Sequence, residues 1–433
     1  MNKENKIVPE LRFPEFIESE KWNIEPLSEL YSFVGTNSFT RDNLNCDEGL
    51  IKNIHYGDIH TKFSTLFDIT KETVPFVNPS IPLEKIKLEC YCKEGDMIFA
   101  DASEDLADVG KSIEIIHLNN EKLLSGLHTL LARQKNSKLR IGFGGHLFLS
   151  PNIRTQIQNE AQGAKVLGIS ATRLSNINVF YPNDKAEQQK IADCLSSLDN
   201  LTNAQNQKLN ALKDHKKGLM QLLFPAEGET VPKLRFKEFE KDGEWVEKTL
   251  GSVAEIVTGN TPSTLEIINY NGTRLFVSPV DIKDNRYITQ TKTTLSDIGF
   301  SRTRKIKANS VLFVCIGSTI GKVAQNKFEC ATNQQLNSLI PNEGYSSDFL
   351  YSILEYNSTK IASIAGNHAV PIINKTSFSA IKLSFPSKTN EQQKIASCLS
   401  TLDDQITTQA QKIEALKEHK KGLMQGLFPN INE

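Results

Sequence analysis

The sequence predicts a mixed α/β (α+β) protein in which two globular modules are separated by two long antiparallel helices. We expect these helices to form a coiled coil and the whole chain to have pseudo-two-fold, circular symmetry. Two observations predict this architecture. A 39-residue segment occurs twice, at 187–225 and 391–429, with 27 of the 39 positions identical. A shorter segment, Val8 to Phe13, is similar to Val231 to Phe236, and we call these two segments the leaders. Each leader precedes one of the two tryptophans, Trp22 and Trp245.

Four segments follow from the repeats: a first module at 1–186, a central shared helix at 187–225, a second module at 226–390 and a C-terminal shared helix at 391–433. A chain of 433 residues exceeds what one hydrophobic core normally supports, so two or more domains are expected. No apolar run approaches the roughly 20 residues that cross a bilayer. We therefore expect a cytoplasmic protein with no membrane partner.

Apolar residues recur in each shared segment at gaps of three and four, which is the pattern of a heptad seam. Gln205 and Gln409 fall on the seam at matched positions, where polar residues fix the register of a helix pair. Pro225 and Pro429 are expected to end the helices. The predicted interface residues are Ile191, Leu195, Leu198, Leu209, Leu212 and Leu219 in the first copy, and Ile395, Leu399, Leu402, Ile406, Ile413, Leu416 and Leu423 in the second.

Basic residues gather near the end of each copy, as Lys213, His215, Lys216 and Lys217 and as their repeat mates. Complementation of the helix dipole explains such a cluster without any ligand. A partner-binding surface is the alternative.

The two modules share a skeleton despite their divergence. Strand-like runs ending in Asp-Ile, 51–59 and 275–282, correspond to each other, and so do the turn-into-strand segments 95–99 and 309–313. Gly110-Lys111 likewise corresponds to Gly321-Lys322.

Motifs for catalysis are incomplete. Gly110-Lys111-Ser112 lacks the first glycine of a phosphate-binding loop, and Asn78-Pro79 lacks the second proline and the aromatic residue of an amino-methyltransferase motif. His128 and His368 have no companion at the spacing of a triad or a zinc site, so both are expected to be core or groove histidines. The sequence therefore predicts no catalytic residue and no metal site.

The remaining chemistry suits binding. The second module carries 15 Lys and Arg against 10 Asp and Glu between 246 and 388, whereas the first carries 17 against 20 between 23 and 185. Amides, cations and aromatic side chains can contact base edges and phosphates, although ordinary polar loops explain the same runs. The candidate DNA-binding residues are His60, Lys62, Lys111 and His128 in the first module, and Asn260, Thr261, Lys283, Arg286, Tyr287, Arg302, Arg304, Lys322, Asn333, Gln334, Gln335 and His368 in the second.

The Glu-Gln-Gln-Lys-Ile-Ala openings at 187 and 391, the His-Lys-Lys-Gly-Leu-Met-Gln-x-Leu-Phe-Pro endings and the Pro-x-Leu-Arg-Phe leaders resemble the specificity (S) subunit of type I restriction–modification systems. The resemblance implies that each module is a target recognition domain and each helix a conserved spacer. It implies a non-catalytic subunit that binds double-stranded DNA, one half of a bipartite asymmetric site per module. It also implies two methyltransferase (M) subunits and restriction (R) subunits as partners, which carry S-adenosylmethionine, ATP and Mg, with no cofactor in this chain.

Two other functions remain open on sequence alone. One is a coiled-coil scaffold whose modules bind other proteins. The other is a diverged enzyme that modifies DNA at two sites.

Overall fold

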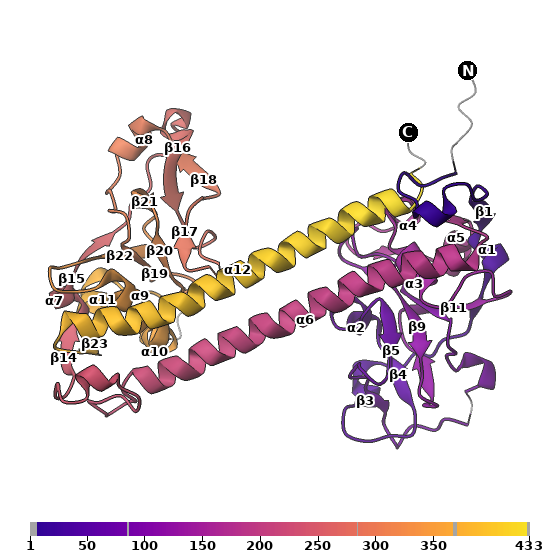
Figure 1. The fold of residues 1–433 in the computed structure, drawn as a ribbon, viewed down its shortest axis with the longest axis horizontal. Coiled ribbons are helices and arrows are strands. Elements are labelled where there is room, and N and C mark those ends of the chain that lie inside the picture. Colours follow the sequence, from indigo (N-terminus) through magenta and orange to yellow (C-terminus); the bar gives the residue numbers. More distant parts are fainter. Residues whose placement is uncertain (1–6, 85, 284, 367–369, 431–433) are drawn as a thin grey trace. The chain divides into compact units, whose positions relative to one another are not determined.

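The computed structural model describes residues 7–84, 86–283, 285–366 and 370–430 (Figure 1). The chain forms two compact units. Unit 1 consists of Met1–Asn203 and Glu414–Glu433, and unit 2 consists of Ala204–Ile413. Each unit therefore contains one variable module together with a part of both repeated helices.

The two repeated segments form the long helices α6 (Lys185–Leu223) and α12 (Thr389–Leu427), each of 39 residues. Alanine, leucine, lysine and glutamine favour helix throughout, and proline is absent until two residues after each helix ends. All thirteen predicted interface residues are buried or half-buried. Both helices end two residues before Pro225 and Pro429, as predicted, and the seam stays a prediction that this burial supports.

Unit 1 is built from short strands and helices: β1 (Asn23–Pro26), α1 (Leu27–Leu30), β2 (Tyr31–Val34), β3 (Leu44–Asn45), β4 (Lys52–Ile54), α2 (Tyr56–Thr61), β5 (Leu66–Asp68), β6 (Phe76–Val77), β7 (Met97–Ala100), β8 (Ala102–Ser103), β9 (Ser112–His117), β10 (Leu123–Ser125), β11 (Thr129–Gln134), α3 (Phe143–Phe148), α4 (Pro151–Glu160), β12 (Leu167–Gly168), α5 (Ala171–Ser175) and β13 (Asn178–Tyr181). Its main sheet has the order β2-β11-β7-β9-β5, and a second sheet has the order β10-β4-β6-β3. Strand β1 pairs with β13, and β12 pairs with β8.

Unit 2 contains β14 (Val246–Thr249), α7 (Leu250–Val253), β15 (Ala254–Thr258), β16 (Tyr270–Val277), β17 (Tyr287–Ile288), β18 (Thr293–Leu295), α8 (Asp297–Ser301), β19 (Val311–Val314), β20 (Val323–Asn326), β21 (Cys330–Thr332), β22 (Leu336–Pro341), α9 (Ser347–Tyr356), α10 (Ser358–Ser363), α11 (Lys375–Ser379) and β23 (Lys382–Phe385). Its main sheet has the order β15-β22-β19-β20-β17, and a smaller sheet has the order β18-β16-β21. Strand β14 pairs with β23.

The main sheets of the two units match strand for strand. Met97 of β7 pairs with Glu114 of β9, and at the corresponding place Val311 of β19 pairs with Gln325 of β20. In both sheets the last strand, β5 or β17, is parallel to its neighbour. The shared skeleton predicted from the sequence is confirmed. The strand register also assigns residues of the main sheet in one unit to structurally equivalent residues in the other, which we call their mates.

The two Asp-Ile runs do not end strands, so that prediction was wrong. In unit 1 the strand β4 stops at Ile54, and Asp58 and Ile59 lie inside α2. The ring nitrogen Nδ1 of His55 accepts a hydrogen bond from the amide of Gly57 at 3.1 Å and caps this helix. Histidine at the start of a helix is not a common cap, so the run gave no helix signal.

Each leader closes onto the end of one long helix in the same way. The amide of Leu11 donates to the carbonyl oxygen of Gly426 at 2.8 Å, and the amide of Leu234 donates to that of Leu222 at 2.9 Å. Gly426 and Leu222 are repeat mates. The N-terminal leader thus packs on the end of α12 in the same way as the internal leader packs on the end of α6, to which it is joined in the chain. The circular repeat expected from the sequence is therefore present inside both units.

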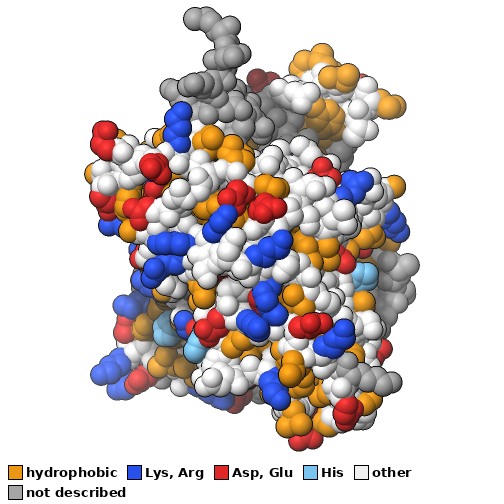
Figure 2. Space-filling model, turned by 90° about the vertical axis from the view of Figure 1, so that its right-hand side faces the viewer, with side chains coloured by type: hydrophobic (Ala, Val, Ile, Leu, Met, Phe, Trp, Pro, Cys, Tyr) orange, Lys and Arg blue, Asp and Glu red, His pale blue; other side chains and the backbone are white. Residues whose placement is uncertain are grey.

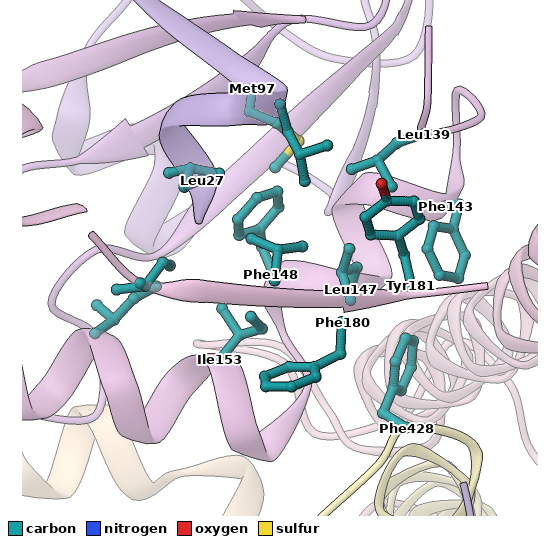
Figure 3. Close-up of a cluster of buried hydrophobic side chains, with 14 of the residues drawn as sticks. Leu27, Met97, Leu139, Phe143, Leu147, Phe148, Ile153, Phe180, Tyr181 and Phe428 are labelled. Atoms are coloured by element: carbon teal, nitrogen blue, oxygen red, sulfur yellow. The ribbon is translucent and has the colours of Figure 1, made fainter. Parts of the chain in front are cut away.

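The core of unit 1 gathers side chains from both ends of the chain (Figure 3). Phe143, Phe180 and Tyr181 of the module lie with Phe428, which follows α12. Unit 2 has the equivalent arrangement. There Phe224 follows α6, and the centroid of its ring lies 6.1 Å from that of Trp245. The helix ends are therefore anchored by the burial of large aromatic side chains.

Polar contacts join the two helices inside each unit. In unit 2 Lys216 forms ion pairs with Asp403 and Glu355, and in unit 1 its repeat mate Lys420 pairs with Asp199. Both helices continue past the lysines, and neither has a basic residue in its last turn. Complementation of the helix dipole therefore does not explain these basic clusters, because that effect is confined to the last turn.

Candidate nucleic-acid interface

An aromatic and histidine cluster lies on unit 1, centred on Tyr56 at the start of α2. The centroid of its ring is 4.7 Å from that of His55, 6.2 Å from that of His60 and 5.3 Å from that of His128. His128 has a positive φ of 56° in the turn between β10 and β11, which brings a side chain from a distant part of the chain to α2.

Hydrogen bonds fix the members of this cluster. The Nζ of Lys111 donates to the carbonyl oxygen of His60 at 2.8 Å, and Nε2 of His60 lies 3.1 Å from the carbonyl oxygen of Ala102. Nδ1 of His128 lies 3.2 Å from Oδ1 of Asp101. The structure thus brings together three residues predicted from sequence, His60, Lys111 and His128.

Lys62, the fourth candidate of the first module, lies on the same helix in an ion pair with Asp58 at 3.0 Å. The guanidinium group of Arg41 also donates two hydrogen bonds of 2.7 Å to this carboxylate. Burial raises the pKa of Asp58, but the hydrogen bonds from Arg41 and Lys62 prevail and hold the pKa below its ordinary value. The ammonium group of Lys62 is exposed and can still face a phosphate.

A groove of about 640 Å³ runs beside His128, lined by residues that include Asn37, Asp101 and Thr129. Burial raises the pKa of Asp101, and the neighbouring His128 lowers it. The amide, imidazole and carboxyl groups at this groove include both hydrogen-bond donors and acceptors. Such groups can distinguish the edges of different bases.

In unit 2 most of the predicted residues form one loop cluster. Asn260 bonds the backbone of both Arg302 and Arg304, and the hydroxyl of Thr261 donates to Oε1 of Gln334 at 2.7 Å. The members of this loop cluster are Asn260, Thr261, Arg302, Arg304, Asn333, Gln334 and Gln335. Sheet register makes Gln335 the mate of His128, since Thr129 pairs with Ala100 as Leu336 pairs with Val314.

Within the loop cluster several polar groups already have partners. The side-chain amide of Asn333 donates to Oε1 of Gln335 at 2.9 Å, and Arg302 pairs with Glu266. Gln334, Arg302 and Arg304 are exposed. These three side chains therefore lie at the surface, where they can meet DNA without disturbing the core of unit 2.

Lys283, Lys322 and Tyr287 lie apart from the loop cluster. The Nζ of Lys322 donates to the carbonyl oxygen of Ile282 at 3.1 Å, much as its mate Lys111 bonds His60. The Tyr287 ring is covered by Lys327, whose Nζ is 4.7 Å from its centroid. Lys283 and Lys322 line a separate cavity, which is described below.

Arg286 cannot serve as a surface contact, which corrects the sequence-based prediction. Its residue is only 3% exposed, and its guanidinium group bonds Gln325 at 2.6 Å and pairs with Asp348 and Asp403. It also lies 4.5 Å from the centroid of the Tyr351 ring. A buried guanidinium with this many partners holds α9 and α12 to the sheet. His368, the other candidate of this module, lies outside the described residues.

Sequence reasoning missed Tyr56, Asp101 and Asn37 as members of the unit 1 surface. Tyr56 stands between two histidines in the sequence, which was an available signal. Asp101 and Asn37 gave none, because only the fold carries them to His128.

Figure 2 shows one face of the molecule, on which basic and acidic side chains are interspersed. This mixture agrees with the formal net charge of −1. In the part of the chain that the structure describes, no three His, Cys, Asp or Glu residues are placed to hold a metal ion. Among the same residues, no helix has both the length and the apolar character needed to cross a membrane.

Comparison with known proteins adds a family and a fold. The family model of the type I restriction modification DNA specificity domain matches residues 63–214 and 242–418. A chain of Methanocaldococcus jannaschii described as the specificity subunit of the type I restriction enzyme MjaX is 26% identical over 353 residues, 79% of this chain and 80% of that protein. The specificity subunit of the type I restriction enzyme HindI of Haemophilus influenzae is 34% identical over 149 residues, 33% of this chain and 32% of that protein.

Solved structures share the fold. The crystal structure of the S subunit of a type I restriction–modification system from M. genitalium matches with a TM-score of 0.62 at 12% identity, covering 98% of this chain and 100% of that one. A chain from a structure of the complex assembly of the type I R-M system matches with a TM-score of 0.55 at 15% identity, covering 94% and 98%. At these identities the likeness supports the architecture alone.

Proposed function

The chain belongs to the type I restriction modification DNA specificity family, and from this premise we propose that it is the sequence-reading subunit of a restriction–modification complex. Each unit is then one target recognition domain that reads one half of a bipartite, asymmetric site in double-stranded DNA. Residues of the two variable modules, 1–186 and 226–390, supply the reading surfaces. The helix segments 187–225 and 391–433 supply the scaffold.

The observation that carries the proposal is the matched position of His128 and Gln335. The two modules have the same sheet order, and at the same turn each presents a different hydrogen-bonding side chain on a polar surface. A fixed frame with a variable reading residue is what two related readers of different sequences require. Within unit 1, Tyr56, His60 and Lys111 complete the surface, and the loop cluster does so in unit 2.

The residues have divided roles in this proposal. Lys62, Lys111, Arg302 and Arg304 contact phosphates, which sets position and affinity but carries no sequence information. His128 and Asn37 in unit 1, and Gln334 and Gln335 in unit 2, face base edges. Because few cations are free on these surfaces, we expect the isolated chain to bind DNA weakly and to need partner subunits for affinity.

The chemistry would reside on those partners. We propose two methyltransferase subunits, with S-adenosylmethionine as methyl donor, and restriction subunits that use ATP and Mg. The long helices offer the matched pair of surfaces that two identical partners require. No catalytic residue is assigned to this chain.

Replacement of residues 23–185 by the corresponding module of another family member tests the proposal. Methylome sequencing of cells that carry the hybrid should show one half of the methylated site changed and the other kept. If both halves changed, or neither did, the division of reading between the two units would be wrong. The reciprocal exchange of residues 246–388 is the matched control, and it should change only the other half.

A further inference from the structure

Unit 2 contains a cavity of about 580 Å³ that the proposed reading surfaces do not use. Its walls come from α6, from the end of α9 and the start of α10, from the turn between β19 and β20, and from the loop after β16. A space of this size is typical of sites for small ligands. Five lysines line it: Lys213, Lys216, Lys217, Lys283 and Lys322.

The carboxylates in the floor of the cavity already have cationic partners. Asp403 pairs with both Lys216 and Arg286, and Glu355 pairs with Lys216. Lys216 is only 6% exposed, so this lysine belongs to the floor and stabilises the helix pair. The positive charge at the mouth is therefore not balanced from below.

The unbalanced positive charge lies on three of these lysines. In the described part of the chain, no carboxylate lies within ion-pair distance of Lys217, Lys283 or Lys322. Lys322 donates one hydrogen bond, to the carbonyl of Ile282, which leaves two of its three N–H groups for a ligand. Three cations around one cavity repel one another unless an anion lies between them.

The backbone of unit 2 is shaped to hold Lys322 in this wall. Gly321 has a φ of +97°, and a Cβ atom there would lie 3.2 Å from the Cβ of Ala362 in α10. Only glycine allows the turn to lie so close to α10 in this conformation. The mate in unit 1, Lys111, lies instead 3.6 Å from the carboxylate of Asp108. The unbalanced charge is thus a property of unit 2.

The cavity also has hydroxyl and aromatic walls. Ser358 and Thr359 add hydroxyl groups, while Tyr351 and Tyr356 add rings. Tyr356 is held by stacking on Phe224, with 5.0 Å between centroids. Ammonium and hydroxyl donors above a partly aromatic floor, whose carboxylates are paired with Lys216 and Arg286, suit a tetrahedral polyanion better than a single carboxylate.

We propose that this cavity binds phosphate groups. They have two possible sources, a free nucleotide or the backbone of duplex DNA, and both present the same oxygens to the lysines. The inference goes beyond the proposed reading function and does not rest on it, because neither source requires recognition of a base sequence.

Lys217→Gln is the test variant, because Lys217 is an exposed helix residue outside the reading surfaces and its loss should leave the fold intact. Its repeat mate offers a matched control, Lys421→Gln, at the same helix position in unit 1. Calorimetric titration of the full-length chain with pyrophosphate and with ATP measures the free source. We expect binding that Lys217→Gln weakens roughly tenfold and that Lys421→Gln leaves unchanged.

The second arm uses a duplex without the recognition site. If DNA is the source, the small anions give no heat, but the slope of log affinity against log salt falls by about one in Lys217→Gln and not in Lys421→Gln. The inference is overturned if Lys217→Gln matches the unmodified chain in both arms, or if both variants lose the same amount. Sequence-specific methylation is measured separately, so a failure here is distinct from a failure of the reading function.

Discussion

The side-chain amide of Gln409 donates to Oε1 of Gln205 at 2.8 Å, and these two residues occupy the same position of the two repeats. The same amide donates to the backbone oxygen of Gln205 at 3.0 Å. From Gln205 to Lys216 along α6, the partner residue in α12 moves back from Gln409 to Asp403, so the two helices run antiparallel within unit 2. Within unit 2, this buried polar pair helps to fix the register of the helix pair.

The Gln205–Gln409 pair should specify register more than it adds stability. Gln205→Leu alone should lower stability by about 1 kcal/mol, because Gln409 loses an acceptor while it stays buried. The double variant Gln205→Leu/Gln409→Leu should recover that loss, since no polar group remains unsatisfied. Thermal unfolding followed by circular dichroism measures both. A double variant less stable than Gln205→Leu would show that the amide pair stabilises the helices directly.

Glu187 is expected to be essential to the stability of unit 1. Its carboxylate, 1% exposed at the side chain, receives two hydrogen bonds from Arg12 and one from the indole of Trp22. Glu187→Ala leaves the guanidinium of Arg12 buried without its counter-ion, and should cost about 3–5 kcal/mol.

Glu391→Ala should cost the same in unit 2, where Arg235 and Trp245 hold Glu391 in the same way. The exposed pair between Glu15 and Lys190 is the control, and Glu15→Ala should change stability by less than about 1 kcal/mol. Equal effects of Glu15→Ala and Glu187→Ala in chemical denaturation would contradict the assignment.

Arg286→Ala should destabilise unit 2 without altering the DNA sequence read. The variant removes one of the two cationic partners of Asp403 and the cationic partner of Asp348, and leaves Gln325 without its donor. We expect a loss of about 3 kcal/mol or more. Methylome sequencing at a permissive temperature should return the original site. A changed half-site with unchanged stability would restore Arg286 to the reading surface.

Glu114 should make the stability of unit 1 depend on pH. Burial raises the pKa of this carboxyl from 4.5 to about 7, against hydrogen bonds from the backbone that lower it. In the unfolded chain Glu114 ionises above its ordinary pKa, whereas in the folded chain it stays neutral until about pH 7. Stability should therefore fall by up to about 3 kcal/mol as pH rises through this window, and level off above it.

Glu114→Gln should abolish this fall and raise stability above pH 7, because an amide carries no charge. The mate of Glu114 in unit 2 is already a glutamine, Gln325. The exposed Glu104 is the control, and Glu104→Gln should leave the pH profile unchanged. A profile unchanged by Glu114→Gln would show that Glu114 is ionised at neutral pH.

Gln334→Ala should relax one position of the half-site read by unit 2. Loss of a base-edge contact costs roughly 1–3 kcal/mol at that position, whereas Arg304→Ala, at a phosphate, should weaken binding to all sequences and lower the salt slope by about one. Methylation of a library of sites separates the two patterns. Gln334→Ala with unaltered specificity and affinity would leave Gln334 an ordinary loop residue.

Much of this architecture is written in the sequence. The repeated 39-residue segment, the heptad gaps and the paired leaders predict two matched helices and a circular order, because each signal is local or a direct comparison of two stretches. The correspondence of Gly95–Phe99 with Asn309–Phe313 also followed from short patterns, and the sheets confirm it.

The tertiary structure alone decided which polar residues face solvent. Arg286 and Lys283 are three positions apart in one basic stretch, yet Arg286 is buried against Asp403, 117 residues away, while Lys283 stays exposed. Tyr56 and His128 meet only because a turn between β10 and β11 reaches α2. The physical reason is that a cation or an imidazole takes its role from the charges and the solvent around it, and distant segments supply these only after the chain has folded.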